Sequence, residues 1–137
     1  GPTGISSHDD HIAVHRATVE AFHRYRPTAA KEPVLYFVAI TDEVAKMLES
    51  EGFEFEVHES ERTPTVVIDI REHKSLKVRA LRMYRSQQDA QDAADMFEGG
   101  PFDYEAFHRA YPAAPPGEVA AGFWEYARAP GPRSRRT

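Results

Sequence analysis

The chain has 137 residues, of which 41% are hydrophobic and 28% charged, so its composition is that of one small globular domain rather than of a disordered segment. The net charge of −5 argues against a general binder of nucleic-acid phosphates. The longest apolar run, Val34–Ile40, is far shorter than the roughly 20 residues of a membrane-spanning helix, and we expect no secretory signal in this piece. The absence of cysteine excludes disulfides and thiolate zinc sites and fits a reducing compartment, so we expect a cytoplasmic protein.

The first part of the chain predicts a loop, a long helix, a strand and a short helix. Residues 1–7 are rich in Gly and Ser and predict the loop. Apolar residues at helical spacing predict a helix over Asp10–Tyr25, capped by Asp9 or Asp10. The continuous apolar run Val34–Ile40 is typical of a strand covered on both faces, as in a parallel sheet. A short helix then follows, from Thr41 or Asp42 through Ser50.

The second part predicts two further strands and three helices. The predicted strands are Phe53–His58 and Thr65–Ile70, and the predicted helices are Glu72–Gln87, Asp89–Phe97 and Phe102–Ala110. Alternating strands and helices place the chain in the α/β class. Residues 129–137 form a basic tail rich in Pro and Gly that we expect to be disordered, which leaves residues 1–128 as the folded part.

The densest cluster of chemically capable residues lies where the first loop enters the first helix. His8, Asp9, Asp10 and His11 combine imidazole and carboxylate groups, which are the ligands expected of a zinc or similar divalent site. The positive end of a helix disfavours an imidazolium, so it keeps the ring neutral and able to bind metal. The alternative is an ordinary acidic helix cap with surface histidines. His15, four residues after His11, is expected to face solvent or to pack.

Three blocks of the sequence resemble the zinc-dependent PIG-L/LmbE deacetylases. The first, Gly1–Phe22, looks like that family's Gly-His-Pro-Asp-His block and the helix that follows it. The second, Lys77–Gln87, is similar to the family pattern Lys-x-x-Ala-Leu-x-x-His-x-Ser-Gln, and Glu105–Phe107 resembles a later Glu-x-Phe. The three blocks stand in the family order and span roughly residues 1–110.

The resemblance implies a role for each matching residue. His11 matches a zinc ligand, and His8 matches a histidine that stabilises the oxyanion or protonates the leaving amine. Asp10 matches the carboxylate that orients and tunes the histidine. The implied fold is a Rossmann-like layered sheet, of which this chain would be the C-terminal part, and the implied cofactor is Zn²⁺ or another divalent metal. A hydrolytic zinc site requires three protein ligands and an open coordination position for water.

The chain also departs from the family pattern. Asp9 stands where the family has Pro, Ser7 where Gly is usual, and Tyr84 where His is usual, while Ser6 occupies a position where some members place a tyrosine. The family's first block, Ala-His-Pro-Asp-Asp-Glu, supplies two more ligands and the general base, and this sequence contains no match to it. We therefore expect the chain to be the C-terminal half of a longer protein, inactive by itself.

The leading hypothesis is a zinc-dependent hydrolase that removes an acetyl or other acyl group from the nitrogen of an amino sugar or glycoconjugate. Its expected partners are that small molecule and the N-terminal half of the same protein, with neither nucleic acid nor a membrane span, and homo-oligomer formation is left open. The alternative is a non-catalytic α/β interaction domain that lost the metal site. A less favoured option is a self-contained metal site made by His8, Asp10, His11 and His15.

Overall fold

The computed structural model describes residues 1–50, 52, 57–100 and 102–123 of the chain. Its helices and strands, in chain order, are α1 (Asp9–Tyr25), η1 (Arg26–Thr28), β1 (Leu35–Ala39), α2 (Asp42–Ser50), α3 (Glu59–Arg62), β2 (Val66–Asp69), η2 (Arg71–His73), α4 (Lys74–Arg82), α5 (Gln88–Gly99) and β3 (Tyr104–Tyr111). The α/β class predicted from the sequence is therefore confirmed. Its Rossmann-like layering stays a prediction.

The strands form a three-stranded antiparallel sheet in the order β1-β3-β2. Both outer strands pair with β3, with Val38 opposite Phe107 on one side and Val67 opposite Ala106 on the other. The expectation that β1 lies in a parallel sheet and is covered on both faces is wrong. The strand stands at the edge of the described sheet, and its Val38 is 55% exposed. A continuous apolar run predicts a strand, but the direction of its neighbour depends on which segment pairs with it.

The central strand β3 replaces the short helix predicted over Phe102–Ala110, and that prediction is wrong. Ala106, Phe107 and Ala110 follow one another at a spacing that suits one side of a helix. Pairing with a strand on each side outweighs that local preference, because it satisfies the backbone of the segment in both directions. The imidazole of His108 also finds a partner outside the strand, with its Nδ1 2.7 Å from the carbonyl oxygen of Thr63.

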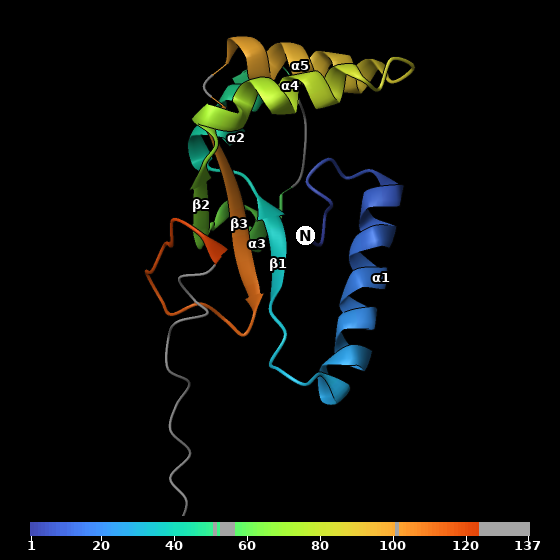
Figure 1. The fold of residues 1–137 in the computed structure, drawn as a ribbon, viewed down its shortest axis with the longest axis vertical. Helices are drawn as coiled ribbons and strands as arrows, with labels where there is room; N and C mark the ends of the chain where they lie inside the picture. Colours follow the sequence, from blue (N-terminus) through green and yellow to red (C-terminus); the bar gives the residue numbers. More distant parts are fainter. Residues whose placement is uncertain (51, 53–56, 101, 124–137) are drawn as a thin grey trace, which may run out of the picture.

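Helices surround this small sheet on two sides (Figure 1). α4 and α5 contact each other and lie side by side across one end of the sheet. α1 runs alongside β1, and two ring contacts join it to the sheet. The ring centroids of His15 and Phe37 are 4.8 Å apart, and those of Phe22 and Tyr111 are 5.4 Å apart.

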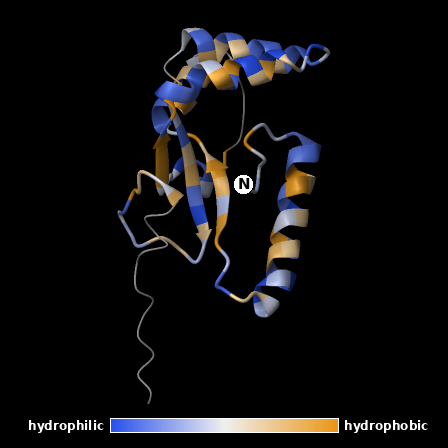
Figure 2. Cartoon of the chain, viewed as in Figure 1, coloured by the Kyte–Doolittle hydropathy of each residue, from blue (hydrophilic) through white to orange (hydrophobic). Residues whose placement is uncertain are grey.

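The buried apolar core is small. Figure 2 shows that the outer strands β1 and β2 are the more hydrophobic ones, while β3 is mixed. The buried hydrophobic residues are mostly alanines, with Val66 and Ile70 as the larger ones: Ala39, Ala45, Val66, Ile70, Ala94, Ala106 and Ala120. Val66 and Ala120 form a cluster against which Tyr36 and Phe107 pack. Since burial of apolar area is the main stabilising term in folding, each of the few bulky core side chains carries a large share of the stability.

The remaining predicted elements agree with the structure to differing degrees. The long first helix, the helix Asp42–Ser50, the strand over Thr65–Ile70 and the helix over Asp89–Phe97 are all present within one to two residues at most ends. The helix expected over Glu72–Gln87 ends early, at Arg82. The predicted strand Phe53–His58 and the predicted disordered tail fall largely or wholly outside the described residues, although His58 itself caps α3. No helix of the described ranges is long and apolar enough to cross a membrane.

The core makes a direct prediction for Val66, the largest fully buried apolar side chain among the described residues. We expect Val66→Ala to lower the free energy of unfolding by about 2 kcal/mol, because it removes two buried methyl groups and leaves a small void. Urea denaturation followed by circular dichroism measures this change. The control, Val14→Ala on the exposed face of α1, should change the free energy by less than about 0.5 kcal/mol. Equal effects of the two substitutions would contradict the assigned core.

Candidate functional site

The first turn of α1 places the histidines that the sequence singles out. The helix begins at Asp9, and the residue before it, His8, is its N-cap. The His8 Nδ1 atom accepts a hydrogen bond from the backbone N–H of Asp10 at 3.2 Å. The expectation that Asp9 or Asp10 caps the helix is therefore wrong. Both carboxylates lie inside the first turn, where their negative charge interacts favourably with the positive end of the helix dipole, but neither caps the helix.

His8 and His11 lie beside each other at the solvent-facing end of this helix. Their ring centroids are 5.4 Å apart. The side chain of His8 is 63% exposed and that of Asp10 is 89% exposed, and Oδ2 of Asp10 lies 3.9 Å from Nδ1 of His8. This separation is too long for a hydrogen bond. The three predicted site residues thus share one small exposed surface.

Ser6 is the polar partner of His11, a role that the sequence does not indicate. Its Oγ lies 2.7 Å from Nδ1 of His11 and 3.5 Å from the carbonyl oxygen of Gly4. When the hydroxyl donates toward Gly4, it accepts from Nδ1–H of His11, and the lone pair of the imidazole is then on Nε2. This arrangement fits a histidine that binds a metal through Nε2. The predicted orienting residue, Asp10, has no such contact with His11 among the described residues.

The loop before α1 holds an unusual backbone conformation. Ile5 and Ser7 have φ angles of 66° and 55°, in a region that costs non-glycine residues free energy. Gly4 also has a positive φ, of 64°, and a Cβ at this position would lie 2.5 Å from the Cβ of His11. Glycine is therefore required at position 4, because it lets the loop backbone pass directly against the histidine. Strain of this kind concentrates at functional sites.

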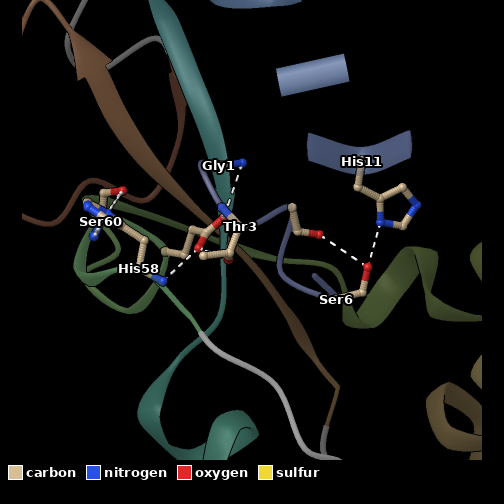
Figure 3. Close-up of polar contacts among 8 residues, drawn as sticks. Gly1, Thr3, Ser6, His11, His58 and Ser60 are labelled. Atoms are coloured by element: carbon tan, nitrogen blue, oxygen red, sulfur yellow. Dashed lines mark hydrogen bonds and ion pairs between the residues drawn. The ribbon is translucent and has the colours of Figure 1, made fainter. Parts of the chain in front are cut away.

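A buried carboxylate ties this loop to the rest of the fold. Glu61, in α3, has no exposed surface. Its Oε1 accepts from the backbone N–H of Thr3 at 3.1 Å, and its Oε2 accepts from the Thr3 hydroxyl and, at 2.8 Å, from the backbone N–H of His58. The backbone nitrogen of Gly1 lies 3.5 Å from Oε1. Figure 3 shows these contacts on one side of the loop and the Ser6–His11 contact on the other.

These contacts determine the charge state of Glu61. Burial by itself raises the pKa of this carboxyl, but hydrogen bonds from Thr3 and His58 outweigh burial and lower the pKa below its ordinary value. The main chain of Glu61 is engaged as well, since its carbonyl accepts from the backbone N–H of Ile40 at 2.8 Å. One residue therefore links the first loop, the start of α3 and the end of β1. Sequence reasoning missed it, because one glutamate among several in a polar stretch gives no signal of burial.

His15 is a packing residue, which is one of the two alternatives that the sequence left open for it. It is half-buried, and its ring meets that of Phe37 in an edge-on contact. Burial lowers the pKa of this imidazole, and the nearby Arg16 acts in the same direction while Glu61 opposes it. The ring is thus held in its neutral form and attaches α1 to β1. It does not join His8 and His11 in a common cluster of possible ligands among the described residues.

The described part of the chain does not complete a metal site from its own side chains. Within residues 1–50, 52, 57–100 and 102–123, no group of three or more His, Cys, Asp or Glu side chains is arranged so that it could hold an ion. A structural or catalytic zinc site requires at least three protein ligands. His11 fits one corner of such a site, with Nδ1 supported by Ser6 and Nε2 open. The self-contained site of His8, Asp10, His11 and His15 is not formed.

The other two sequence blocks meet in the structure. Lys77 of α4 and Glu105 of β3 form an ion pair in which the ammonium group donates to Oε1. The ammonium nitrogen also lies 4.0 Å from the centre of the Phe97 ring, within the range of a cation–π contact. Tyr84, at the position where a histidine was expected from the resemblance, lies beyond the end of α4 and is exposed.

Comparison with protein-family models, with curated proteins and with solved structures gives no match for this chain.

The Glu61 contacts predict how stability depends on pH. Because the folded-state pKa lies below the unfolded value of about 4.5, the stabilisation from Glu61 is present in full above that pH and is lost as the pH falls through the folded-state pKa. Glu61→Gln should remove this dependence. It should also lower the free energy of unfolding at neutral pH by about 1–3 kcal/mol, since an amide cannot accept from all of these donors.

Urea denaturation at a series of pH values between about 3 and 7 measures both effects. The control is Glu59→Gln, at an exposed glutamate in the same short helix. Its free energy of unfolding should depend on pH as that of the wild type does. If the free energy of unfolding changed with pH in the same way in the wild type and in Glu61→Gln, the carboxylate would not anchor the loop.

Proposed function

We propose that the chain supplies part of the active site of a zinc-dependent hydrolase that removes an acyl group, such as acetyl, from the nitrogen of an amino sugar or glycoconjugate. The observation that carries the proposal is the pair His8 and His11, whose ring centroids are 5.4 Å apart on an exposed helix start. Each ring has its Nδ1 engaged by the chain, and no described residue engages either Nε2, which could therefore act on a ligand. The resemblance of the surrounding block to the PIG-L/LmbE deacetylases names the same two residues.

In this proposal His11 binds the metal through Nε2. Ser6 accepts from Nδ1–H of His11 and so fixes the tautomer and the direction of the ring, as an outer partner of a ligating histidine does. The zinc, or another divalent ion in its place, would lower the pKa of a bound water and so supply the nucleophile. The further ligands and the general base come from outside this chain, from an N-terminal half of the same protein that carries the His-Pro-Asp-Asp-Glu block.

His8 acts on the other side of the scissile amide. Its Nδ1 accepts from the backbone N–H of Asp10, so the neutral ring carries its proton on Nε2 and presents it as a donor. A donor held in that position stabilises negative charge as it develops on the carbonyl oxygen. The other role that the resemblance gives to His8, protonation of the departing amine, would require the imidazolium, in which Nδ1 donates and no longer accepts from Asp10. In that form Nδ1–H of His8 would face Oδ2 of Asp10, 3.9 Å away.

The complete protein would then be a cytoplasmic enzyme, in keeping with the absence of cysteine. The resemblance implies a Rossmann-like layered sheet with this chain as its C-terminal part, and the mixed α/β content agrees with that only at the level of class, because the described strands are antiparallel. The ion pair between Lys77 and Glu105 supports it too, because it joins the two other blocks of the resemblance.

A second candidate is a non-catalytic α/β interaction domain. It is favoured by the lack of any group of three possible ligands among the described residues and by Asp9, which adds negative charge where the family has Pro. The coding sequence upstream of Gly1 separates the two candidates. A His-Pro-Asp-Asp-Glu motif on a predicted strand and loop supports the enzyme, and a start codon close to Gly1 supports the interaction domain.

The ligand assignment predicts the metal content of the protein that includes this upstream half. We expect about one divalent ion per chain after dialysis, and we expect His11→Ala to abolish it, since an open site with three ligands loses one third of its protein donors. The matched control is His23→Ala, at the last turn of the same helix, which should keep the ion. Elemental analysis measures the content. An unchanged value in His11→Ala would refute the assignment.

The role of His8 predicts a kinetic effect without loss of metal. In the same protein, His8→Ala should lower kcat for release of acetate from an N-acetylated amino sugar by roughly 10²- to 10³-fold, because it removes a group that acts on charge in the transition state. Elemental analysis of the variant should still find the ion. Loss of the ion in His8→Ala would make this residue a ligand instead. Turnover by the 137-residue chain alone would contradict the requirement for an additional half.

A further inference from the structure

Helix α1, which begins at the two histidines, meets the sheet along one narrow stripe. None of its 17 residues is buried. Its half-buried residues lie three and four positions apart, and so on one side of the helix: Ile12, His15, Val19 and Phe22. Figure 1 shows the helix alongside β1, apart from the helices at the end of the sheet. Because so little of α1 is covered, few contacts determine whether it stays docked.

A ring contact with the sheet lies in each half of this stripe. In the C-terminal half, the ring centroids of Phe22 and Tyr111 are 5.4 Å apart, and the guanidinium group of Arg26 lies 4.2 Å from the centre of the Tyr111 ring. In the N-terminal half, the ring of His15 meets that of Phe37, with centroids 4.8 Å apart. His15 is the titratable member of the stripe. The charge of this one ring therefore bears on how the N-terminal half of α1 is held.

The surroundings of His15 oppose its protonation. Burial is the largest effect, and it lowers the pKa of the imidazole. Four groups from the first loop, from α1 itself and from α3 act on the ring through their charges: the Gly1 ammonium, Arg16, His58 and Glu61. The carboxylate of Glu61 favours the imidazolium, whereas the other three groups disfavour it.

The strands next to His15 offer it an uncharged ring. Phe37 of β1 carries no charge, and the ring of its neighbour Tyr36 packs against Phe123, with centroids 4.7 Å apart. On β3 the residue opposite Phe37 is His108, whose Nδ1 lies 2.7 Å from the carbonyl oxygen of Thr63. An imidazolium at position 15 would therefore exchange water for an apolar neighbour, which costs free energy.

The docked and released states of α1 consequently bind a proton with different affinity. In a released helix, His15 would be in water with the ordinary pKa of about 6.5, and docking lowers that pKa. Docking is thus strongest above about pH 6.5. It weakens as the pH falls from there to the pKa of the docked state, because the released form takes up the proton first.

The loop before α1 favours release. Thr3 is tied to the carboxylate of Glu61, but Ile5 and Ser7, which follow it, hold positive φ angles of 66° and 55°. These conformations cost free energy while α1 is docked, and a loop that extends on release would relieve that cost. The contact between His15 and the sheet therefore acts against strain stored in the loop.

We propose that His15 is an acid-sensitive switch: its neutral ring holds the N-terminal half of α1 against Phe37, and its protonation releases that half while the sheet stays folded. The contact of Phe22 keeps the C-terminal half in place. The released part includes His8 and His11, so acid would withdraw the histidine pair from the fold. The inference concerns the docking of α1 alone, so it is tested without metal or substrate and does not depend on the proposed hydrolase activity.

Hydrogen exchange of the 137-residue chain at pH 5 and at pH 7, followed by NMR, tests this proposal. Each measured rate, divided by the intrinsic rate at the same pH, gives the opening equilibrium of that amide. We expect the opening equilibrium of residues 14–20 to be about threefold or more larger at pH 5 than at pH 7, and that of α5 to change less. The first turn is left out, because protonation of its cap, His8, would loosen it directly. Unchanged opening of residues 14–20, or an equal change in α5, would overturn the proposal.

Two matched variants assign the effect to one ring. His15→Phe keeps an uncharged ring against Phe37 and removes the titrating group, so the opening of residues 14–20 should become the same at both pH values. His23→Phe, at an exposed position in the last turn of the helix, should keep the wild-type difference. Circular dichroism checks that both variants fold. A wild-type difference in His15→Phe would overturn the proposal.

A further measurement needs no variant. The NMR signals of the His15 ring protons in the wild-type chain report the titration of this imidazole directly. We expect a midpoint below the ordinary value of about 6.5, because burial opposes the charged form. A midpoint at or above that value would show that docking does not oppose protonation, and the proposal would fail.

Discussion

The carboxylate of Glu61 is the interaction on which the arrangement of the candidate site depends. It is fully buried, and it accepts hydrogen bonds from the backbone and hydroxyl of Thr3 and from the backbone of His58. A buried charge is tolerated when several donors compensate its loss of water, and removing those donors leaves a large penalty. Because the same residue accepts from Ile40 through its main chain, the first loop cannot move without disturbing both α3 and the end of β1.

This anchor explains how a strained loop persists in a chain with so small a core. Ile5 and Ser7 hold positive φ angles, and Gly4 passes close to His11. Conformations of this kind last only where the surrounding structure outweighs their cost. The contacts of Thr3 supply that support before the strained segment, and the cap formed by His8 supplies it afterwards. The directions of the two exposed imidazoles are thus set by polar contacts of the loop rather than by apolar packing around the rings.

The histidine pair and an open apolar space beside the sheet are two separate consequences of this architecture. Most of the buried apolar residues are alanines, so the elements approach each other closely around Ala39, Ala45 and Ala106. Some of the bulkier side chains, among them Val44, Leu48 and Phe97, line an open space between the sheet and α2, α4 and α5. The ion pair of Lys77 and Glu105 ties α4 to the central strand at the wall of that space. The same two residues that join two blocks of the sequence pattern therefore also line that space.

The sequence by itself determined the α/β class, the long first helix, the two outer strands and the place of His8, Asp10 and His11 at a helix start, because hydrophobic periodicity and helix-start chemistry are local properties. Only the tertiary structure decided the rest. Residues 104–111 became the central strand, against their local helical spacing, because strands on both sides pair with them. Ser6 reached His11, and Glu61 reached Thr3, through loop reversal and through contacts 58 residues apart in the chain. Such contacts leave no periodic trace in a sequence, since they depend on which distant segments the fold brings together.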